Sequence, residues 1–392
     1  MIKTLIFESG RSGYGGSFKC CWLNAVILKR QGYQPSVISV NDSIYWKSLN
    51  QEGIKTKIIL HRFCSNEIRK KTINKKLRGF SRKITRRFPN LSIFCDSLLH
   101  FIFIKNLKKY IISEKIKLVH TNTNFINDMP VYKAAYDLKL PLICHLRSMP
   151  QRRLTPPEQR LSKYRQSCFI AVSKATLKEW VKAGIPEYKI KLIYDSLPHV
   201  QNVQRCNKDL QNENDNNIYL LYVGRLEKRK SIHILIKALL AIRNKNWKLS
   251  IVGDGFERKN LERMVKENGL SEKVAFFGFQ KSVEKFYKSH DILIAPSLHE
   301  ALGMVILEAM QFGIAVIGSK SGGIPEIIEN DDDGILFETD DICSLRNAIE
   351  NLINDQKKRI QIGLNGMKKV ENIFSEKIFT EKIIEIYIEL LK

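Results

Sequence analysis

The amino-acid sequence predicts an α/β protein made of two domains, each built on a parallel β-sheet. Short apolar runs alternate with longer segments of helical periodicity along almost the whole chain, which is typical of parallel-sheet proteins. The 392 residues, 44% hydrophobic and 27% charged, suffice for two domains that each bury a core. A polar, Asn-rich segment at residues 201–217 separates the two halves of this pattern, and we interpret it as a linker.

The expected N-terminal domain comprises residues 1–200, and the C-terminal domain comprises residues 218–374. The apolar residues of segment 375–392 repeat with helical spacing and predict a terminal helix, but the pattern does not say on which domain this helix packs. The strands expected in the first domain are Thr4–Phe7, Ser36–Val40, Thr56–Leu60, Leu118–Thr121, Leu142–His145, Phe169–Val172 and Lys191–Tyr194. Those expected in the second are Tyr219–Val223, Lys248–Val252, Val274–Phe276, Ile292–Ala295, Ala315–Gly318 and Gly334–Phe337.

The net charge of +25 is confined to one half of the chain. Residues 1–200 contain 37 Lys and Arg against 12 Asp and Glu, whereas residues 201–392 contain 28 of each kind. A lysine-rich proteome would spread this charge evenly. The asymmetry therefore indicates a negatively charged partner for the first domain, such as a membrane surface or a phosphorylated acceptor.

Other features exclude several classes of protein. No apolar run reaches the ~20 residues of a membrane-spanning helix, and the apolar stretch at residues 1–7 is too short for a signal peptide, so we expect a cytoplasmic protein. The eight cysteines form no Cys-x-x-Cys pair and are expected to be free thiols. The acidic run Asp331–Asp333 precedes Gly334 and an apolar strand, which is typical of a solvated turn rather than a metal site.

A glycine-rich turn, SGRSGYGGS at residues 9–17, follows the first expected strand and precedes a segment of helical periodicity at 18–30. Gly15 and Gly16 would let backbone N–H groups approach a phosphate at the start of that helix. The spacing differs from the dinucleotide-binding fingerprint Gly-x-Gly-x-x-Gly. A tight turn without a ligand is the alternative interpretation.

The strongest signal is a pair of glutamates, Glu300 and Glu308, that follow the strand ending at Ala295. The first falls in a loop and the second about one turn into a helix, with Gly303 between them. Free N–H groups at the start of this helix could hold a pyrophosphate, and the helical Glu308 could reach a ribose diol.

This spacing resembles the Glu-x7-Glu motif of the glycosyltransferase family 4 enzymes, which have the GT-B fold of two facing Rossmann-like domains. Further segments match in the same order: Gly224-Arg225-Leu226 followed by Lys230, Val252-Gly253-Asp254-Gly255, Val274–Gly278, and Gly318–Glu326. The match covers essentially the whole C-terminal half. Ser231 departs from the family pattern, which usually has glycine there.

The resemblance implies a retaining transfer of a sugar from a nucleotide-sugar donor, UDP- or GDP-linked first of all. Glu308 would bind the ribose hydroxyls and Glu300 would contact the transferred sugar. Arg225 and Lys230 would stabilise the leaving diphosphate, so no metal or other cofactor is expected. The expected donor site consists of Gly15, Gly16, Gly224, Arg225, Lys230, Phe277, Gly278, Glu300, Ala301, Leu302, Gly303, Met304 and Glu308.

The N-terminal half matches the family more loosely. Gly15-Gly16 resembles its glycine pair near the leaving phosphate. His145 stands where the family has a histidine close to the donor sugar, with His120 as the competing candidate. The expected catalytic residues are therefore Glu300, His145, Arg225 and Lys230. The usual Pro-Asn-Gly after the last strand of the N-terminal domain is replaced by Tyr194-Asp195-Ser196.

Residues 68–88 carry ten Lys or Arg and no acidic residue, and their apolar residues recur every three or four positions. This pattern predicts an amphipathic helix that could lie on the anionic inner face of a membrane; an ordinary helix with a solvated basic face is the alternative. No nucleic-acid-binding motif accompanies the charge. The expected membrane or acceptor contacts are Arg69, Lys70, Lys71, Lys75, Lys76, Arg82, Lys83, Arg86 and Arg87.

The predicted function is the transfer of a sugar to a glycan or lipid-linked acceptor, as in the synthesis of a bacterial surface polysaccharide. Arg147, Arg152 and Arg153 could add positive charge near that acceptor. Two alternatives remain open at this stage. One is a nucleotide-sugar epimerase on the same scaffold, and the other is a noncatalytic protein associated with the membrane.

Overall fold

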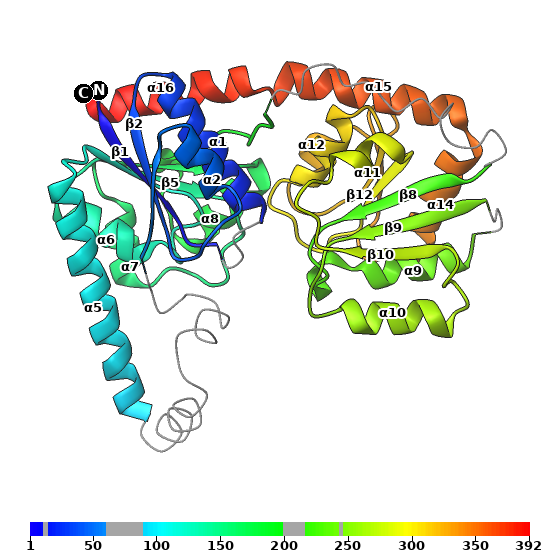
Figure 1. Ribbon diagram of the computed structural model, residues 1–392, viewed down its shortest axis with the longest axis horizontal. Coiled ribbons are helices and arrows are strands. Elements are labelled where there is room, and N and C mark those ends of the chain that lie inside the picture. The colour runs from blue at the N-terminus through cyan, green and yellow to red at the C-terminus, as the bar shows by residue number, and fades with distance from the viewer. Residues whose placement is uncertain (11–14, 60–88, 199–215, 243–245) are drawn as a thin grey trace. The chain divides into compact units, whose positions relative to one another are not determined.

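A computed structural model describes residues 1–10, 15–59, 89–198, 216–242 and 246–392, with backbone alone for 89–100 (Figure 1). The chain forms two compact units. The first comprises Met1–Val172, Thr176–Ile193 and Thr380–Lys392, and the second comprises Ser173–Ala175 and Tyr194–Phe379. The end of the chain thus returns to the first unit. The expected linker and the expected basic helix at 68–88 lie largely or wholly outside the described residues.

The first unit is built on a parallel sheet. In the described part of the chain its order is β3-β2-β1-β4-β5-β6-β7. The strands are β1 (Lys3–Glu8), β2 (Gln34–Ser39), β3 (Lys55–Ile58), β4 (Leu118–Thr121), β5 (Leu142–Leu146), β6 (Ser167–Ala171) and β7 (Ile190–Leu192). Most of these strands are continuously buried, as expected for a parallel sheet covered on both faces.

Helices cover both faces of this sheet (Figure 1). They are α1 (Gly16–Arg30), α2 (Trp46–Gln51), α5 (Pro89–Ser113), α6 (Met129–Asp137), α7 (Pro156–Ser162), α8 (Lys174–Ala183), the short η1 (Glu187–Lys189) and the terminal α16 (Glu376–Leu391). Tyr387 of α16 is fully buried and bonds to His120 of β4, with 2.8 Å between its hydroxyl oxygen and Nδ1 of the imidazole. This contact identifies the unit on which the terminal helix packs.

The second unit repeats the design with a parallel sheet of order β10-β9-β8-β11-β12-β13. Its strands are β8 (Ile218–Val223), β9 (Trp247–Val252), β10 (Val274–Gly278), β11 (Ile292–Ala295), β12 (Ala315–Ser319) and β13 (Ile335–Phe337). Its helices are η3 (Lys228–Lys230), α9 (Ile232–Leu240), α10 (Arg258–Glu267), α11 (Glu284–Ser289), α12 (Met304–Gln311), α13 (Ile324–Ile327), α14 (Ile342–Asn354) and α15 (Gln356–Ile373). Asp341 and Asp355 accept backbone N–H bonds at the starts of α14 and α15.

Each strand expected from the sequence is present, with its described ends within two residues of the prediction. The two-domain parallel α/β class is therefore confirmed. Each unit has its own apolar core between its sheet and its helices. Cys20, Cys21, Cys144, Cys168 and Cys343 are free thiols; the side chains of Cys64, Cys95 and Cys206 lie outside the description.

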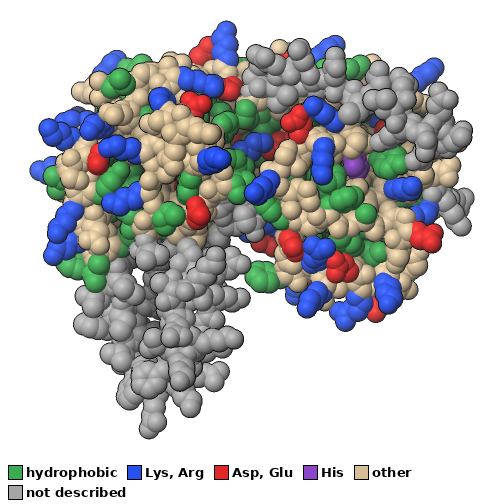
Figure 2. Space-filling view, viewed as in Figure 1, with side chains coloured by type: hydrophobic (Ala, Val, Ile, Leu, Met, Phe, Trp, Pro, Cys, Tyr) green, Lys and Arg blue, Asp and Glu red, His purple; other side chains and the backbone are tan. Residues whose placement is uncertain are grey.

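The surface reflects the uneven charge of the sequence. On the face shown in Figure 2, Lys and Arg predominate over Asp and Glu among the described residues of the first unit, whereas the second unit carries both kinds interspersed. Among the described residues, none of the helices is both long and apolar enough to cross a bilayer.

Candidate active site

The site residues predicted in the second unit gather at one edge of its sheet. Strand β9, which follows β8 in the chain, pairs with one side of β8. Strand β11 pairs with the other side. The loops that leave β8 and β11 therefore diverge at the carboxyl ends of neighbouring strands. Open α/β sheets bind ligands in the crevice formed at such a point. The loop after β8 contains Arg225 and Lys230, and the loop after β11 contains Glu300.

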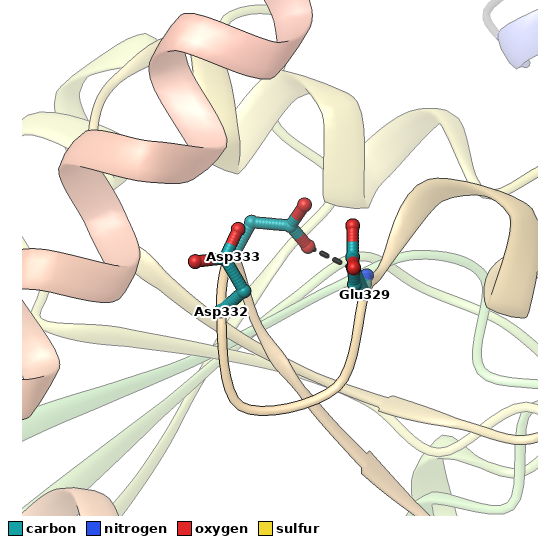
Figure 3. A group of neighbouring side chains, drawn as sticks. All are labelled: Glu329, Asp332 and Asp333. Atoms are coloured by element: carbon teal, nitrogen blue, oxygen red, sulfur yellow. Dashed lines mark hydrogen bonds between the residues drawn. The ribbon is translucent and has the colours of Figure 1, made fainter.

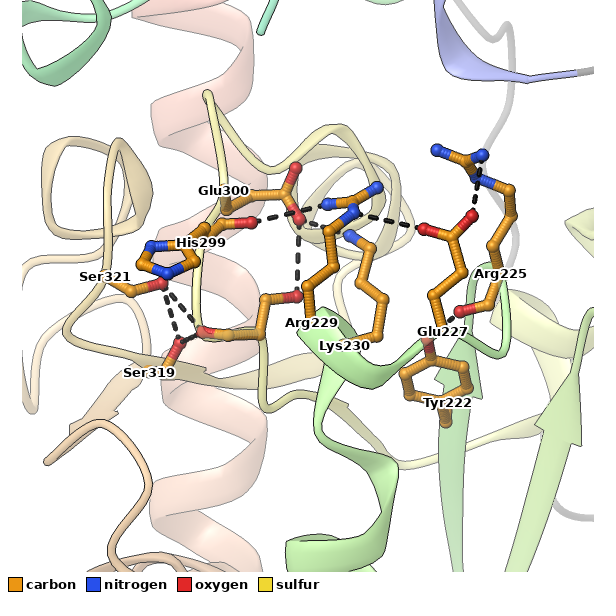
Figure 4. Close-up of polar contacts among 10 residues, drawn as sticks. Tyr222, Arg225, Glu227, Arg229, Lys230, His299, Glu300, Ser319 and Ser321 are labelled. Atoms are coloured by element: carbon orange, nitrogen blue, oxygen red, sulfur yellow. Dashed lines mark hydrogen bonds and ion pairs between the residues drawn. The ribbon is translucent and has the colours of Figure 1, made fainter. Parts of the chain in front are cut away.

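Lys230 and Glu300 point toward each other and form an ion pair (Figure 4). Their side chains are 14% and 18% exposed, so the pair is largely shielded from water. Burial acts to raise the pKa of Glu300, but the charge and hydrogen bond of Lys230, followed by the charge of Arg229, outweigh it and lower this pKa. Glu300 is therefore a carboxylate at neutral pH, and it is paired with Lys230 at the edge of the crevice.

A second carboxylate, Glu227, lies beside this pair (Figure 4). One of its oxygens is 2.8 Å from Nη1 of Arg225 and the other accepts a hydrogen bond from Nε of Arg229 at 3.1 Å. Arg229 also reaches the backbone oxygen of His299 at 3.4 Å, and its own backbone oxygen accepts from Leu298. These contacts tie the turn after β8 to the loop that carries Glu300.

Helix α12 begins at the expected place between the two glutamates. Its N-cap is Gly303, whose φ of +114° is a conformation that favours glycine. Ala301, Leu302 and Met304 surround this start, and Leu302 is buried. Glu308, about one turn into the helix, accepts a hydrogen bond from the Tyr287 hydroxyl at 2.7 Å. Its carboxylate is thereby fixed on the helix that starts in the same crevice.

Close backbone packing explains two of the glycine motifs. At Gly322, φ is +54° and a Cβ would lie 1.8 Å from the backbone oxygen of Glu300. At Gly253, a Cβ would lie 1.9 Å from the backbone oxygen of Gly224. Any side chain at these positions would displace the loops that carry Glu300 and Arg225. These glycines therefore maintain the shape of the site.

The backbone conformation at Ser231 explains why the family usually has glycine at this position. Its backbone lies in the left-handed region, with φ of +48° and ψ of +37°, at the junction of η3 and α9. Glycine adopts this conformation without steric cost, which explains why glycine is usual there. The serine is fully buried and the turn still forms, so the departure leaves Lys230 on the same short helix.

The remaining donor residues expected in the second unit lie at the end of β10, the outermost strand beside β9. Phe277 and Gly278 end β10, and Gly278 has φ of +63°. Phe277 is 44% exposed and packs edge-on against buried Phe286. An exposed aromatic face at this strand end suits contact with a planar base.

The acidic turn has its own internal partners. Carboxylate oxygens of Glu329, Asp332 and Asp333 lie within 4.8 Å of one another (Figure 3). Asp333 accepts a hydrogen bond from the backbone N–H of Glu329 at 2.7 Å and pairs with Lys369 at 2.5 Å, while Asp332 accepts from Asn365. The predicted turn is present, with Asp331 and Asp332 exposed, but Asp333 is buried rather than solvated.

In the first unit, a buried polar cluster lies at the corresponding switch point between β1 and β4. Gly15 caps α1 and Gly16 begins it. The Glu8 carboxylate is fully buried and accepts hydrogen bonds from Asn122, Thr123, Ser17 and the N–H of Gly10. Burial raises the pKa of Glu8, although the hydrogen bonds and the charge of Arg147 oppose the shift.

Arg147 directly follows β5 and is partly exposed at this cluster. Its Nη1 donates to the side-chain oxygen of Asn122 and to its backbone oxygen, the latter at 3.1 Å. Asp128 holds the loop after β4 through the N–H groups of Thr123 and Asn124, and burial raises the pKa of Asp128 to about 7. Perturbed carboxyl groups beside a cation at a strand end are typical of binding sites.

His145, expected to contact the donor sugar, lies deeper in its strand than the sequence indicated. This residue lies within β5 and is fully buried, with its Nδ1 at 2.7 Å from Nε2 of His120. His120 is buried as well and is bonded to Tyr387. The two imidazoles stack, with 4.9 Å between their ring centroids. Arg147, two positions later, stands at the strand end instead.

Comparison with known proteins agrees with this architecture. The group 1 glycosyl transferase model matches residues 204–369, and the model named Glycosyltransferase Family 4 matches residues 28–197. The chain belongs to the family 4 glycosyltransferases. The family resemblance read from the motifs is thereby confirmed across both halves of the chain.

Two curated relatives illustrate the range of this family. An uncharacterised glycosyltransferase of Methanocaldococcus jannaschii is 33% identical over 239 residues, which cover 58% of this chain and 61% of that protein. The lipopolysaccharide core biosynthesis glycosyltransferase LpsE of Rhizobium meliloti is 28% identical over 265 residues, which cover 67% and 72%. The alignment thus spans about three fifths of the archaeal protein.

A solved structure supports the fold of this family 4 member. HepE of Anabaena, crystallised with UDP and glucose, matches 99% of this chain and all of its own chain with a TM-score of 0.78 and 21% identity. The predicted GT-B fold is confirmed. Sequence reasoning identified the glutamate pair, Arg225 and Lys230, but it did not single out Glu227, Arg229, Glu8 or Asn122.

Proposed function

We propose that this family 4 member is a retaining glycosyltransferase that moves a sugar from a nucleotide diphosphate donor to a glycan acceptor. The observation that carries the proposal is the shielded Lys230–Glu300 ion pair at the switch point of the second sheet. Arg225 lies on the same turn as Lys230, and Glu308 lies on the helix that follows Glu300. Binding groups for diphosphate, sugar and ribose therefore share one sheet edge.

Each group has a distinct task in this mechanism. As the bond between the anomeric carbon and the diphosphate breaks, negative charge grows on the leaving phosphate. Lys230 and Arg225 stabilise that charge, which is the contribution a metal ion would otherwise make. Glu300 accepts hydrogen bonds from hydroxyls of the transferred sugar, and Glu308 accepts from the ribose diol. HepE, which shares the fold, was crystallised with UDP and glucose, and this favours a UDP-linked donor as the first to test.

The test is a donor screen with purified protein. We expect release of nucleoside diphosphate from one of UDP-, GDP-, ADP- or dTDP-sugars, unaffected by EDTA and lost in Glu308→Ala and Lys230→Ala. Binding without release would favour an epimerase or a noncatalytic protein. A strict requirement for a divalent cation would contradict the roles given to Arg225 and Lys230.

We further propose an anionic acceptor, lipid-linked or phosphorylated, that is used at the inner face of the cytoplasmic membrane during surface polysaccharide synthesis. The excess of positive charge in residues 1–200 and the position of Arg147 at a strand end support an acidic partner for the first unit. LpsE, a relative named for lipopolysaccharide core biosynthesis, supports this type of acceptor.

Vesicle binding tests the membrane part of this proposal. Anionic vesicles should bind the protein in a salt-sensitive manner, and replacing Lys75, Lys76, Arg82 and Lys83 by Gln should reduce binding at least tenfold, because each basic group near such a surface contributes roughly 1 kcal/mol. The matched control replaces four exposed lysines of the second unit: Lys248, Lys259, Lys266 and Lys281. Equal losses in both variants would count against a specific role for the basic segment.

A further inference from the structure

The charged side chains around the proposed diphosphate site alternate in sign. Arg225 pairs with Glu227, Glu227 pairs with Arg229, and Lys230 pairs with Glu300 (Figure 4). Arg229 lies between the two carboxylates, and its charge contributes to the lowered pKa of Glu300. Within this row Glu227 bridges the arginines that flank it.

The bridge by Glu227 is an exposed contact. The side chains of Arg225 and Arg229 are 47% and 40% exposed, and that of Glu227 is 25% exposed. Exposed ion pairs contribute little to folding, so neutralising Glu227 should leave the unit folded. Its position matters more for a ligand, because it occupies guanidinium groups whose planar donors suit phosphate oxygens.

Arg229 has the features of a further phosphate-binding residue. It belongs to η3 together with Lys230, and its Nη1 already reaches across to the loop of Glu300. The bond from Leu298 N–H to its backbone oxygen, at 2.8 Å, holds the two loops together. Its guanidinium is therefore fixed near the same crevice as Lys230, on a turn whose backbone is anchored.

We propose that Glu227 competes with the donor diphosphate for Arg225 and Arg229, and that Arg229 is a third cation that binds this diphosphate. In the structure Glu227 is bonded to both arginines. When the diphosphate binds, both guanidinium groups release the Glu227 carboxylate, which becomes hydrated, and bind phosphate oxygens instead. As the product leaves, Glu227 pairs with the arginines again. Glu227 thus limits the affinity for the leaving group and favours product release. This inference rests on the proposed function, since it concerns the same site.

Binding of diphosphates by the full-length chain tests the proposal. The probes are inorganic pyrophosphate, which needs no base recognition, and the nucleoside diphosphate and monophosphate of the base found in the donor screen. We expect Glu227→Gln to bind pyrophosphate and the diphosphate about tenfold more tightly, which corresponds to ~1.4 kcal/mol. The monophosphate should change much less. Arg229→Gln should weaken both diphosphate probes about tenfold.

The matched control is Glu284→Gln, which removes an exposed carboxylate that is paired with Lys288 on α11 and causes the same change in net charge. It should leave pyrophosphate affinity unchanged. In the double variant Glu227→Gln/Arg229→Gln, the gain from Glu227→Gln should shrink, because one of the two released cations is absent. Inhibition of turnover by the product diphosphate should become stronger in Glu227→Gln.

Two results would overturn the proposal separately from the proposed function. If wild type binds the diphosphate but Glu227→Gln binds it equally or more weakly, Glu227 positions the arginines instead of competing for them. If Arg229→Gln binds as wild type does, Arg229 is not a phosphate ligand. Failure of the wild-type protein to bind any diphosphate would overturn the proposed function and this inference together.

Discussion

Replacing Lys230 by Ala should reduce the turnover of the donor by about 10²–10³ or more, because one preorganised positive group on a growing negative charge contributes on this scale. The substitution also leaves the shielded carboxylate of Glu300 without its ammonium partner. That unpaired charge repels the diphosphate, so affinity for the nucleoside diphosphate should fall as well. Steady-state release of the diphosphate and equilibrium binding measure the two effects.

Two further variants separate these contributions. Lys228 lies on the same short helix η3 but is exposed, so Lys228→Ala should change turnover by less than about threefold. The double variant Lys230→Ala/Glu300→Gln should bind the diphosphate more tightly than Lys230→Ala alone, although turnover stays low. Equal affinities of the single and double variants would show that the remaining carboxylate does not oppose binding.

The residues predicted for the second unit's site come together at one edge of its sheet, because the motif is nearly contiguous at each strand end. Lys230 and Glu300 are seventy residues apart, yet each follows a strand with a clear apolar pattern, and parallel strands bring their carboxyl ends to one edge. The pairing of Glu227 with both arginines was not predicted. Arg225 belongs to the family motif, but Glu227 and Arg229 occupy positions where the motif prescribes nothing, and side-chain direction within a short turn has no periodic signature.

The first unit was harder to read for a different reason. Glu8, Asn122 and Arg147 come from three strand ends that are separated by long stretches of chain, and nothing in the local sequence links them. The prediction for His145 depended on where β5 ends. The strand extends to Leu146, so that His145 remains inside the sheet and Arg147 emerges from it. A difference of one residue at a strand end decides whether a side chain lies inside the sheet or in the loop that follows.

The buried histidine pair should make the first unit sensitive to acid. Burial lowers the pKa of His120 from its ordinary 6.5 to about 3, with a further contribution from the charge of Arg147. Burial, Arg147 and His120 lower the pKa of His145 as well. Both imidazoles are neutral when folded but bind protons when unfolded below pH 6.5. Stability from this pair is therefore complete above that value and is lost as the pH falls toward 3.

The expected loss between pH 7 and pH 5.5 is about 1 kcal/mol for each histidine. Asp128 acts in the opposite direction, since its raised pKa favours the folded state as the pH falls. A comparison with His145→Asn removes the contribution of Asp128, because both proteins contain it. Asn has both an amide donor and a carbonyl acceptor, so it can replace His145 whichever ring holds the proton. The variant should be less stable at pH 7 by about 1–3 kcal/mol, yet it should lose about 1 kcal/mol less than the parent on acidification.

Urea unfolding, followed by tryptophan fluorescence, can measure how much unfolding free energy the parent and the variant lose on acidification, for the first unit alone. Trp247 lies in the second unit, whereas Trp22, Trp46 and Trp180 lie in the first, so a Trp247→Phe background reports on the first unit. The parent and His145→Asn would be compared at pH 7 and 5.5 in this background. If both lose the same free energy of unfolding, His145 must bind a proton in the folded state about as readily as in the unfolded chain. That result would contradict the claim that both imidazoles are neutral in the folded unit.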